Sequence, residues 1–315
     1  MKICTILAVC MLSVSLLPIE VARAGDAPRV GWLSRKITAP GLEYHIFSSA
    51  SAGEEVSYHI FFPPGYKSDQ KKRFPVIFWL HGRGSFSGAM GVYGAGGGKG
   101  PAAMAEYYGE AMKSGKMPEA LVVFPNGLGG GMWSDSLDGK TPVETIFIKE
   151  LIPEIDKRFR TIGRREGRII EGFSMGGYGA ARLGFKYPGL FRAVSILGAG
   201  PLQREFTGAI GPSQSAEDRE LVLQKIYGGS QDYFFRQSPW HIAEENKAKL
   251  QSAILIRQAI GALDTTLPAN REFHEHLASL GITHTFEVVA GVKHDALALL
   301  KAMGDGNWKF YTQEH

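Results

Sequence analysis

The sequence of 315 residues predicts an α/β fold, in which a mostly parallel central sheet carries helices on both faces. Short apolar runs recur along the chain, and such continuous runs are typical of strands that are buried on both sides. Segments with helical spacing separate most of the runs, and this alternation indicates parallel strands. A Gly-x-Ser-x-Gly sequence at residues 172–176 also joins one run directly to one helical segment. We therefore expect one sheet, with functional groups gathered at the carboxyl edge of its strands.

The first half of the chain opens with two runs of β character at residues 42–47 and 56–62, the second ended by Pro63-Pro64-Gly65. We expect these two strands to form an antiparallel edge of the sheet. Residues 76–80 and 120–124 are continuously apolar, which predicts buried strands. Residues 141–159 have apolar side chains at helical spacing and are predicted to form a helix.

The second half continues the alternation. Strands are predicted at 169–170, 193–197, 253–259 and 285–289, and helices at about 175–187, 268–280 and 293–303. Residues 201–246 interrupt the rhythm because they are long, polar and rich in aromatic side chains. We interpret them as a partly helical insertion over the carboxyl edge; a surface excursion unrelated to substrate is the alternative.

Residues 1–24 have the pattern of a signal peptide. Lys2 precedes an apolar stretch at 3–17, and Ala22-Arg23-Ala24 forms a small-x-small cleavage site before Gly25. The apolar stretch is short for a bilayer span, so we expect cleavage, with no stable membrane span afterwards. The hypothesis is a periplasmic or secreted protein with residues 25–315 as a single domain. Both cysteines lie in the leader, which excludes a cysteine nucleophile from the mature chain.

Charge and motifs exclude several classes of function. The formal net charge is +4 with both signs interspersed, so no nucleic-acid partner is expected. The glycine-rich residues 94–100 differ from a phosphate-binding loop, because Tyr93 replaces a required glycine and Gly100 replaces the Ser or Thr. His274 and His276 would point away from each other on a helix. We therefore expect neither a cofactor nor a metal.

Ser174 is the candidate nucleophile. An apolar run precedes Gly172-Phe173-Ser174-Met175-Gly176 and a helical segment follows it, which is the context of a nucleophile elbow. Glycines suit the strained corner because side chains there would collide with the strand and the helix. A glycine-rich turn that bears a surface serine is the alternative.

The base and the acid of a triad are expected downstream of the serine. His294 follows the last predicted strand, at the position where a catalytic histidine would lie. Asp264 lies just beyond the predicted strand 253–259 and is the favoured acid. Asp232 is the competing acid, although no strand precedes it.

These residues and three flanking motifs resemble the putative-esterase family of α/β-hydrolases. That family includes feruloyl and acetyl xylan esterases, S-formylglutathione hydrolases, enterochelin esterases and mycolyltransferases. The resemblance covers about residues 40–305, and its motifs are 75–84, 150–154, 172–177, 270–282 and 291–295. It implies an α/β-hydrolase fold and a serine hydrolase that uses Ser174, Asp264 and His294.

The oxyanion of such a reaction needs two backbone donors. The amide of Met175, which follows the serine, is expected to be one of them. The resemblance implies the amide of Arg83 as the second. Related enzymes keep a substrate-facing loop after the glycines at 129–131, so Trp133 and Asp135 are expected to bind substrate.

The functional hypothesis is an exported serine esterase that acts on acyl or feruloyl esters of polysaccharide or on small esters. Its partner would be an ester substrate, with carbohydrate-linked esters among the candidates. One alternative is an acyltransferase to a sugar or lipid alcohol that uses the same triad. The other is a non-catalytic, hydrolase-like binding module, which would not need all three of Ser174, Asp264 and His294.

Overall fold

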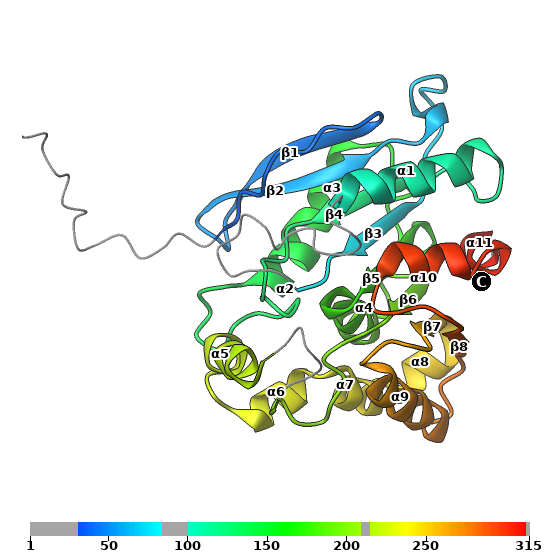
Figure 1. Ribbon diagram of the computed structural model, residues 1–315. Coiled ribbons are helices and arrows are strands. Elements are labelled where there is room, and N and C mark those ends of the chain that lie inside the picture. Colours follow the sequence, from blue (N-terminus) through cyan, green and yellow to red (C-terminus); the bar gives the residue numbers. More distant parts are fainter. Residues whose placement is uncertain (1–30, 84–99, 209–214, 313–315) are drawn as a thin grey trace, which may run out of the picture.

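A computed structural model describes residues 31–83, 100–208 and 215–312 (Figure 1). The predicted leader and most of the glycine-rich residues 94–100 lie outside these ranges. None of the helices within them is long and apolar enough to cross a membrane. The described chain is built around one eight-stranded sheet in the order β1-β2-β4-β3-β5-β6-β7-β8.

The sheet is antiparallel at one edge and parallel elsewhere. β1 pairs antiparallel with β2, and β2 pairs antiparallel with β4, as the sequence predicts for the leading strands. The remaining neighbours are parallel. The strands are β1 (Leu42–Ser49), β2 (Glu54–Phe61), β3 (Val76–Leu80), β4 (Leu121–Pro125), β5 (Arg168–Phe173), β6 (Ala193–Leu197), β7 (Leu255–Gly261) and β8 (Thr285–Val289).

Two hydrophobic cores cover the two faces of this sheet. Successive side chains of β3 alternate between them, because a strand points its residues to opposite faces. Phe78 lies in one core and Trp79 in the other, and all five residues of β3 are buried. This explains why the central strands are continuously apolar in the sequence.

Helices complete the cores on both faces (Figure 1). One face carries α2 (Val143–Thr145), the π-helical turn η2 (Ile146–Leu151), α3 (Ile152–Arg158), α4 (Met175–Lys186) and α9 (Leu267–Ser279). The other face carries α1 (Gly100–Lys113), α10 (Ala296–Ala302) and α11 (Asp305–Thr312). Two short 3-10 turns, η1 (Pro64–Tyr66) and η3 (Arg165–Gly167), precede β3 and β5.

The stretch at 201–246 contains three helices, namely α5 (Ala216–Tyr227), α6 (Gln231–Gln237) and α7 (Pro239–Glu245), and α8 (Lys247–Ala253) follows it. Ser215, Ser230 and Ser238 cap the first three by accepting hydrogen bonds from backbone N–H groups of the first turn. Four aromatic side chains of the stretch, those of Phe206, Tyr227, Phe234 and Trp240, are buried in the core.

Several elements differ from the sequence prediction, and α11 is not predicted at all. The prediction also omits α1, whose Ala, Met and Glu residues favour a helix but whose interior contains Gly109. Its Gly109 is nevertheless needed, since a Cβ there would lie 2.9 Å from the Phe61 ring. The strand predicted from residue 253 begins at Leu255, because α8 occupies the preceding residues. α10 begins only at Ala296, because Asp295 caps it and leaves His294 in the loop.

Candidate active site

Ser174 occupies a strained corner between β5 and α4. Its backbone has φ 58° and ψ −122°, a conformation that costs a non-glycine residue on the order of 1–3 kcal/mol. The flanking glycines make the corner possible. A Cβ on Gly176 would lie 1.9 Å from the carbonyl oxygen of Leu80, and one on Gly172 would lie 2.3 Å from that of Gly176. The backbone of this corner therefore packs directly against the end of β3.

A chain of hydrogen bonds connects Ser174 to Asp264 through His294. The Ser174 hydroxyl lies 3.0 Å from Nε2 of His294, and Nδ1 of the same ring lies 2.7 Å from Oδ2 of Asp264. Ser174 and Asp264 are buried, whereas the His294 side chain remains 33 % exposed. An imidazole held in this way can accept a proton from the hydroxyl while the carboxylate fixes its orientation.

The fold explains why these three side chains meet. Ser174, Asp264 and His294 follow β5, β7 and β8, and parallel strands bring their carboxyl ends to one edge. The competing acid, Asp232, lies on α6, where its exposed carboxylate pairs with Arg236. The structure thus brings together the three residues favoured by the sequence and leaves Asp232 in a separate ion pair.

Asp264 is held in its ionised form. Its second oxygen, Oδ1, accepts hydrogen bonds from the backbone N–H and the hydroxyl of Thr266 at 2.8 and 2.9 Å. Burial opposes ionisation of this carboxyl, but the hydrogen bonds from His294 and Thr266 outweigh it and lower the pKa of Asp264 below its ordinary value. Sequence reasoning missed Thr266, whose position two residues after the acid was the available signal.

The two predicted oxyanion donors lie on one small cavity. Met175 begins α4 directly after the serine, and Arg83 follows the end of β3. Both residues line this cavity together with Met132, Gly200 and Pro201. The segments that carry the two predicted donors therefore border the same small space, and one of them begins directly after Ser174.

His81 fixes the loop that contains Arg83. Its Nε2 accepts a hydrogen bond from the Gly127 N–H at 3.0 Å, so its Nδ1 carries the proton and donates to the Gly82 carbonyl at 2.7 Å. Burial lowers the pKa of His81 to about 4, although the bond to Gly82 opposes the shift. A neutral histidine with a hydrogen bond at each ring nitrogen thus joins the loop after β3 to the loop after β4.

Trp133 and Asp135 bind other parts of the protein rather than forming an open wall. Trp133 is completely buried, and its indole N–H donates to the His81 carbonyl at 3.2 Å. Its ring leaves no room for a Cβ on Gly179, which would approach it to 2.4 Å. The Asp135 carboxylate accepts from the N–H and the hydroxyl of Thr145 at 2.9 and 2.6 Å. Trp133 therefore lies in the core and not on the substrate-facing surface expected from the sequence.

Arg182 connects this loop to the helices of residues 201–246. No sequence motif predicts this connection. Its buried guanidinium donates to the carbonyl oxygens of Trp133 and Gln237 at 3.1 and 2.8 Å and pairs with Glu144 at 2.5 Å. Burial opposes ionisation of Glu144, but the charges of Arg182 and Lys186 prevail and lower the pKa of Glu144 to about 2. α4, the helix that begins directly after Ser174, thus carries a buried positive charge that holds the loop at Trp133 and the end of α6 in place.

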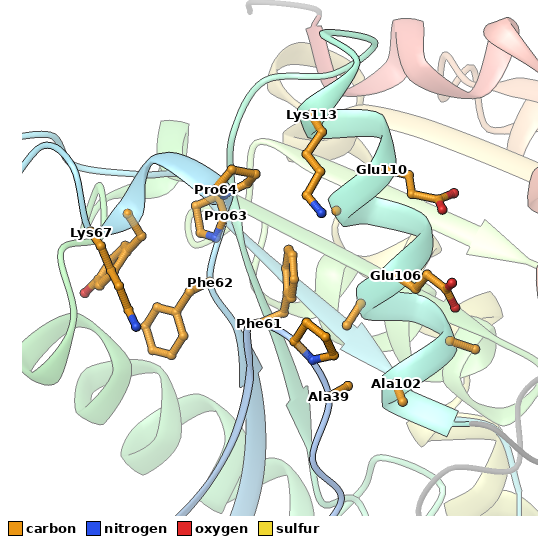
Figure 2. A pocket seen from close by; sticks show the side chains of 16 residues that line it. Ala39, Phe61, Phe62, Pro63, Pro64, Lys67, Ala102, Glu106, Glu110 and Lys113 are labelled. Atoms are coloured by element: carbon orange, nitrogen blue, oxygen red, sulfur yellow. The ribbon is translucent and has the colours of Figure 1, made fainter.

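A larger cavity of about 720 Å³ lies elsewhere, between the end of β2 and α1 (Figure 2). Phe61, Phe62 and Pro63 form its apolar wall, and Glu106 and Glu110 project from α1 beside it. Neither Ser174 nor His294 lines it. Among the residues that the structure describes, no group of histidine and acidic side chains is arranged to hold a metal ion.

Comparisons with known proteins agree on one family. Residues 49–297 match the family described as Putative esterase. The chain is 29% identical over 279 residues to Esterase Rv1288 of Mycobacterium tuberculosis, an alignment that covers 82% of this chain and 57% of that protein. It is also 29% identical over 164 residues to the endo-1,4-beta-xylanase/feruloyl esterase of Xylanibacter ruminicola, covering 50% of this chain and 22% of that protein. The chain thus spans little more than half the length of the first relative and much less of the second.

Solved structures show the same fold at low sequence identity. A ferulic acid esterase superposes with a TM-score of 0.68 and 23% identity, covering 86% of this chain and 97% of that chain. An S-formylglutathione hydrolase from Staphylococcus aureus superposes with a TM-score of 0.62 and 16% identity, covering 86% of this chain and 98% of that one. The mostly parallel sheet with its helices is therefore that of an α/β-hydrolase, as the sequence predicts.

Proposed function

Since this chain belongs to the Putative esterase family, we propose that it is a serine hydrolase of carboxylic esters. Ser174 is the nucleophile, His294 the general base and Asp264 the residue that orients the base. The observation that carries this proposal is the continuous hydrogen-bonded chain from Ser174 through His294 to Asp264. Its position at the carboxyl edge of the parallel strands, beside a cavity, supports the same assignment.

The reaction proceeds in two balanced halves. Nε2 of His294 takes the hydroxyl proton while Oγ of Ser174 bonds to the ester carbonyl carbon, and the carbonyl electrons move to its oxygen. When the intermediate collapses, the bond to the alcohol breaks, and His294 returns the proton to the leaving oxygen. Water then repeats the sequence on the acyl-enzyme, which releases the acid and restores Ser174.

The developing negative charge is stabilised by the amides of Met175 and Arg83. Each such donor contributes on the order of 3 kcal/mol to the transition state when it is fixed in advance. The strained corner at Ser174 fixes the first amide. The bonds of His81 to Gly82 and Gly127 fix the loop that carries the second. Asp264 holds the imidazole tautomer and stabilises the imidazolium that forms.

The substrates we propose are acyl or feruloyl esters of polysaccharide, together with small esters. The names of the relatives, feruloyl esterase among them, support this class. Export to the periplasm or the exterior is proposed from the leader pattern at residues 1–24. N-terminal sequencing of the protein from its native host should then begin at Gly25, and a mature protein that retains Met1 would refute export.

One labelling experiment tests the proposed site. A fluorophosphonate should attach to Ser174, as located by peptide mass spectrometry, and should abolish hydrolysis of 4-nitrophenyl acetate and methyl ferulate. A Ser174→Ala variant should take up no label, and EDTA should leave the wild-type rate unchanged. Loss of activity on chelation, restoration by zinc and no label on Ser174 would instead show a metal-dependent hydrolase.

A further inference from the structure

Arg219, on α5, is a buried cation whose hydrogen-bonding capacity is mostly unused. Only 1% of its surface is exposed. Its guanidinium stacks on the Phe206 ring at 4.3 Å, and Nη2 donates to the Glu205 carbonyl at 3.2 Å. Its Nε and Nη1 have no hydrogen-bond partner among the described residues. Buried polar groups are nearly always paired, so donors left open in this way indicate a missing acceptor.

A second arginine faces the same space. Arg83 and Arg219 line the small cavity that Met175 and Pro201 also line, beside the predicted oxyanion donors. Asp218 pairs with Nη2 of Arg83 at 3.3 Å, but Nε of Arg83 is also buried and has no partner among the residues that the structure describes. In the described part of the chain, two guanidinium groups at this cavity are thus balanced by one carboxylate.

The missing acceptor is expected to be negatively charged. Burial, and after it the charge of Arg83, lowers the pKa of Arg219 to about 10, which leaves the side chain protonated at neutral pH. An uncompensated buried cation is unfavourable, and the attraction of an anion beside it would offset both the desolvation cost and the repulsion from Arg83. Guanidinium groups match the planar, two-oxygen geometry of carboxylates.

We propose that this cavity is a binding site for a carboxylate carried by the ester substrate, held by the side chains of Arg219 and Arg83. The inference rests on the proposed esterase function, because it places the carboxylate next to the carbonyl that Ser174 attacks. The cavity is small, with a volume of about 10 Å³, so it admits one oxygen atom of such a group and not a sugar ring. The preferred substrates are therefore half-esters, in which an acid remains free near the ester bond.

Two matched substrate pairs test the site. Methyl 4-acetoxybenzoate and 4-acetoxybenzoate differ by a carboxylate on the alcohol side of the scissile bond. Methyl 4-nitrophenyl succinate and mono(4-nitrophenyl) succinate differ in the same way on the acyl side. For each pair, the ratio of kcat/KM for the acid to that for the methyl ester is measured in wild type, Arg219→Gln and Arg236→Gln. Comparing ratios between variants cancels differences in intrinsic reactivity.

The Arg219→Gln change should lower this ratio by about tenfold or more in one of the pairs, because hydrogen bonds to a charged group are lost. Arg236, an exposed arginine paired with Asp232 on α6, is the matched control and should leave the ratio unchanged. Equal ratios in wild type and Arg219→Gln for both pairs would overturn the proposal. An equal fall in Arg236→Gln would also overturn it, since a general charge effect would then explain the result.

A binding measurement keeps the inference testable if Arg219→Gln does not fold. In Ser174→Ala, calorimetric titration should show that one acid binds about tenfold tighter than its methyl ester, and equal or weaker binding of both acids would overturn the site. This measurement is independent of catalysis. Unaltered turnover of methyl 4-acetoxybenzoate by Ser174→Ala would refute the proposed nucleophile without affecting the binding comparison.

Discussion

Two buried carboxylates, Asp264 just beyond β7 and Glu171 on β5, have different partners. Asp264 holds His294, whose side chain is 33 % exposed and reaches Ser174. Glu171 lies three residues before Ser174 on β5 and pairs with Arg257 of β7 at 2.6 Å. Both members of this second pair are buried. The parallel strands β5, β7 and β8 therefore support one open acid–base pair and one closed ion pair.

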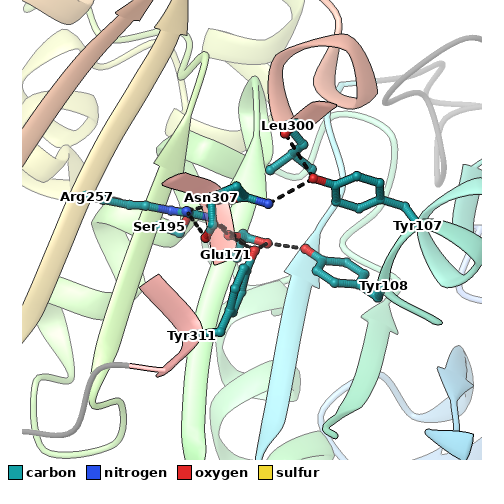
Figure 3. A network of polar contacts seen from close by, with 8 residues as sticks. All are labelled: Tyr107, Tyr108, Glu171, Ser195, Arg257, Leu300, Asn307 and Tyr311. Atoms are coloured by element: carbon teal, nitrogen blue, oxygen red, sulfur yellow. Dashed lines mark hydrogen bonds and ion pairs between the residues drawn. The ribbon is translucent and has the colours of Figure 1, made fainter. Parts of the chain in front are cut away.

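The closed pair belongs to a network that saturates its hydrogen bonds (Figure 3). Arg257 donates to Ser195, Asn307 and the Tyr311 hydroxyl at 2.8, 2.7 and 3.0 Å. Tyr108 and Tyr311 both donate to Glu171. The network thereby joins β5, β6 and β7 to α1 and α11, and its cation keeps its charge at any physiological pH.

The contrast between the two pairs shows which buried pair can take part in proton transfer and which can only fix the structure. A histidine changes its charge near neutral pH and here retains a route to solvent and to a hydroxyl. An arginine that is sealed and fully hydrogen-bonded has no proton to exchange and can only fix geometry. Substitutions should therefore separate the two regions, with lost turnover at one and lost stability at the other.

The largest effect is expected at Ser174. Ser174→Ala should lower kcat for 4-nitrophenyl acetate by roughly 10⁴-fold or more, because the proposed nucleophile is gone. Its free energy of unfolding, measured by urea denaturation, should fall little. Near wild-type turnover by a folded Ser174→Ala protein would show that Ser174 is not the nucleophile. The contrast between the Asp264–His294 pair and the Glu171–Arg257 pair would then have no basis.

Asp264→Asn should lower kcat by about 10²–10⁴-fold, because the amide no longer stabilises the imidazolium or selects its tautomer. Asp232→Asn is the matched control, since that carboxylate pairs only with the exposed Arg236 in the described chain. Steady-state kinetics of the two folded variants gives the ranking. The opposite order would assign the acid to Asp232.

Arg257→Met should affect stability instead. It leaves the Glu171 carboxylate buried without its cation, which costs about 3–5 kcal/mol in the free energy of unfolding. The protein that remains folded should keep its kcat, and Glu171→Gln combined with Arg257→Met should recover part of the loss. A fall in kcat without destabilisation would show that the network serves the reaction directly.

The smallest effect concerns pH. His81 is buried in its neutral form with a pKa of about 4, below its ordinary value of 6.5. The unfolded chain therefore binds a proton more readily, and stability is lost as pH falls from about 6.5 to about 4, by up to roughly 3 kcal/mol. Urea denaturation across this range should show a shallower acid loss for His81→Gln than for wild type. Identical pH slopes would contradict the predicted contribution of His81.

Sequence reasoning succeeded where local pattern decides the structure. β3, β6 and β8 have the predicted bounds because each is a short apolar run with clear ends. Ser174, Asp264 and His294 could be selected because each follows a predicted strand, and the parallel sheet brings such positions to one edge.

Features that depend on distant segments could not be predicted. Trp133 is buried because Gly127 and Gly179 leave room for its ring, and neither glycine is adjacent to it in sequence. The pairing of Glu171 with Arg257 joins two strands 86 residues apart. α1 forms despite Gly109 in its interior, because Met104, Tyr108 and Met112 complete one core of the sheet.

Arg182 has a practical consequence for protein engineering. Its guanidinium donates both to the loop at Trp133 and to Gln237 near the end of α6. The segment at 201–246 therefore cannot be exchanged independently of α4. A chimera that grafts the corresponding segment of another esterase must supply an acceptor for Arg182 at the position of Gln237. Without one, buried N–H groups of Arg182 would lose their acceptors at Gln237, although Glu144 would still balance its charge.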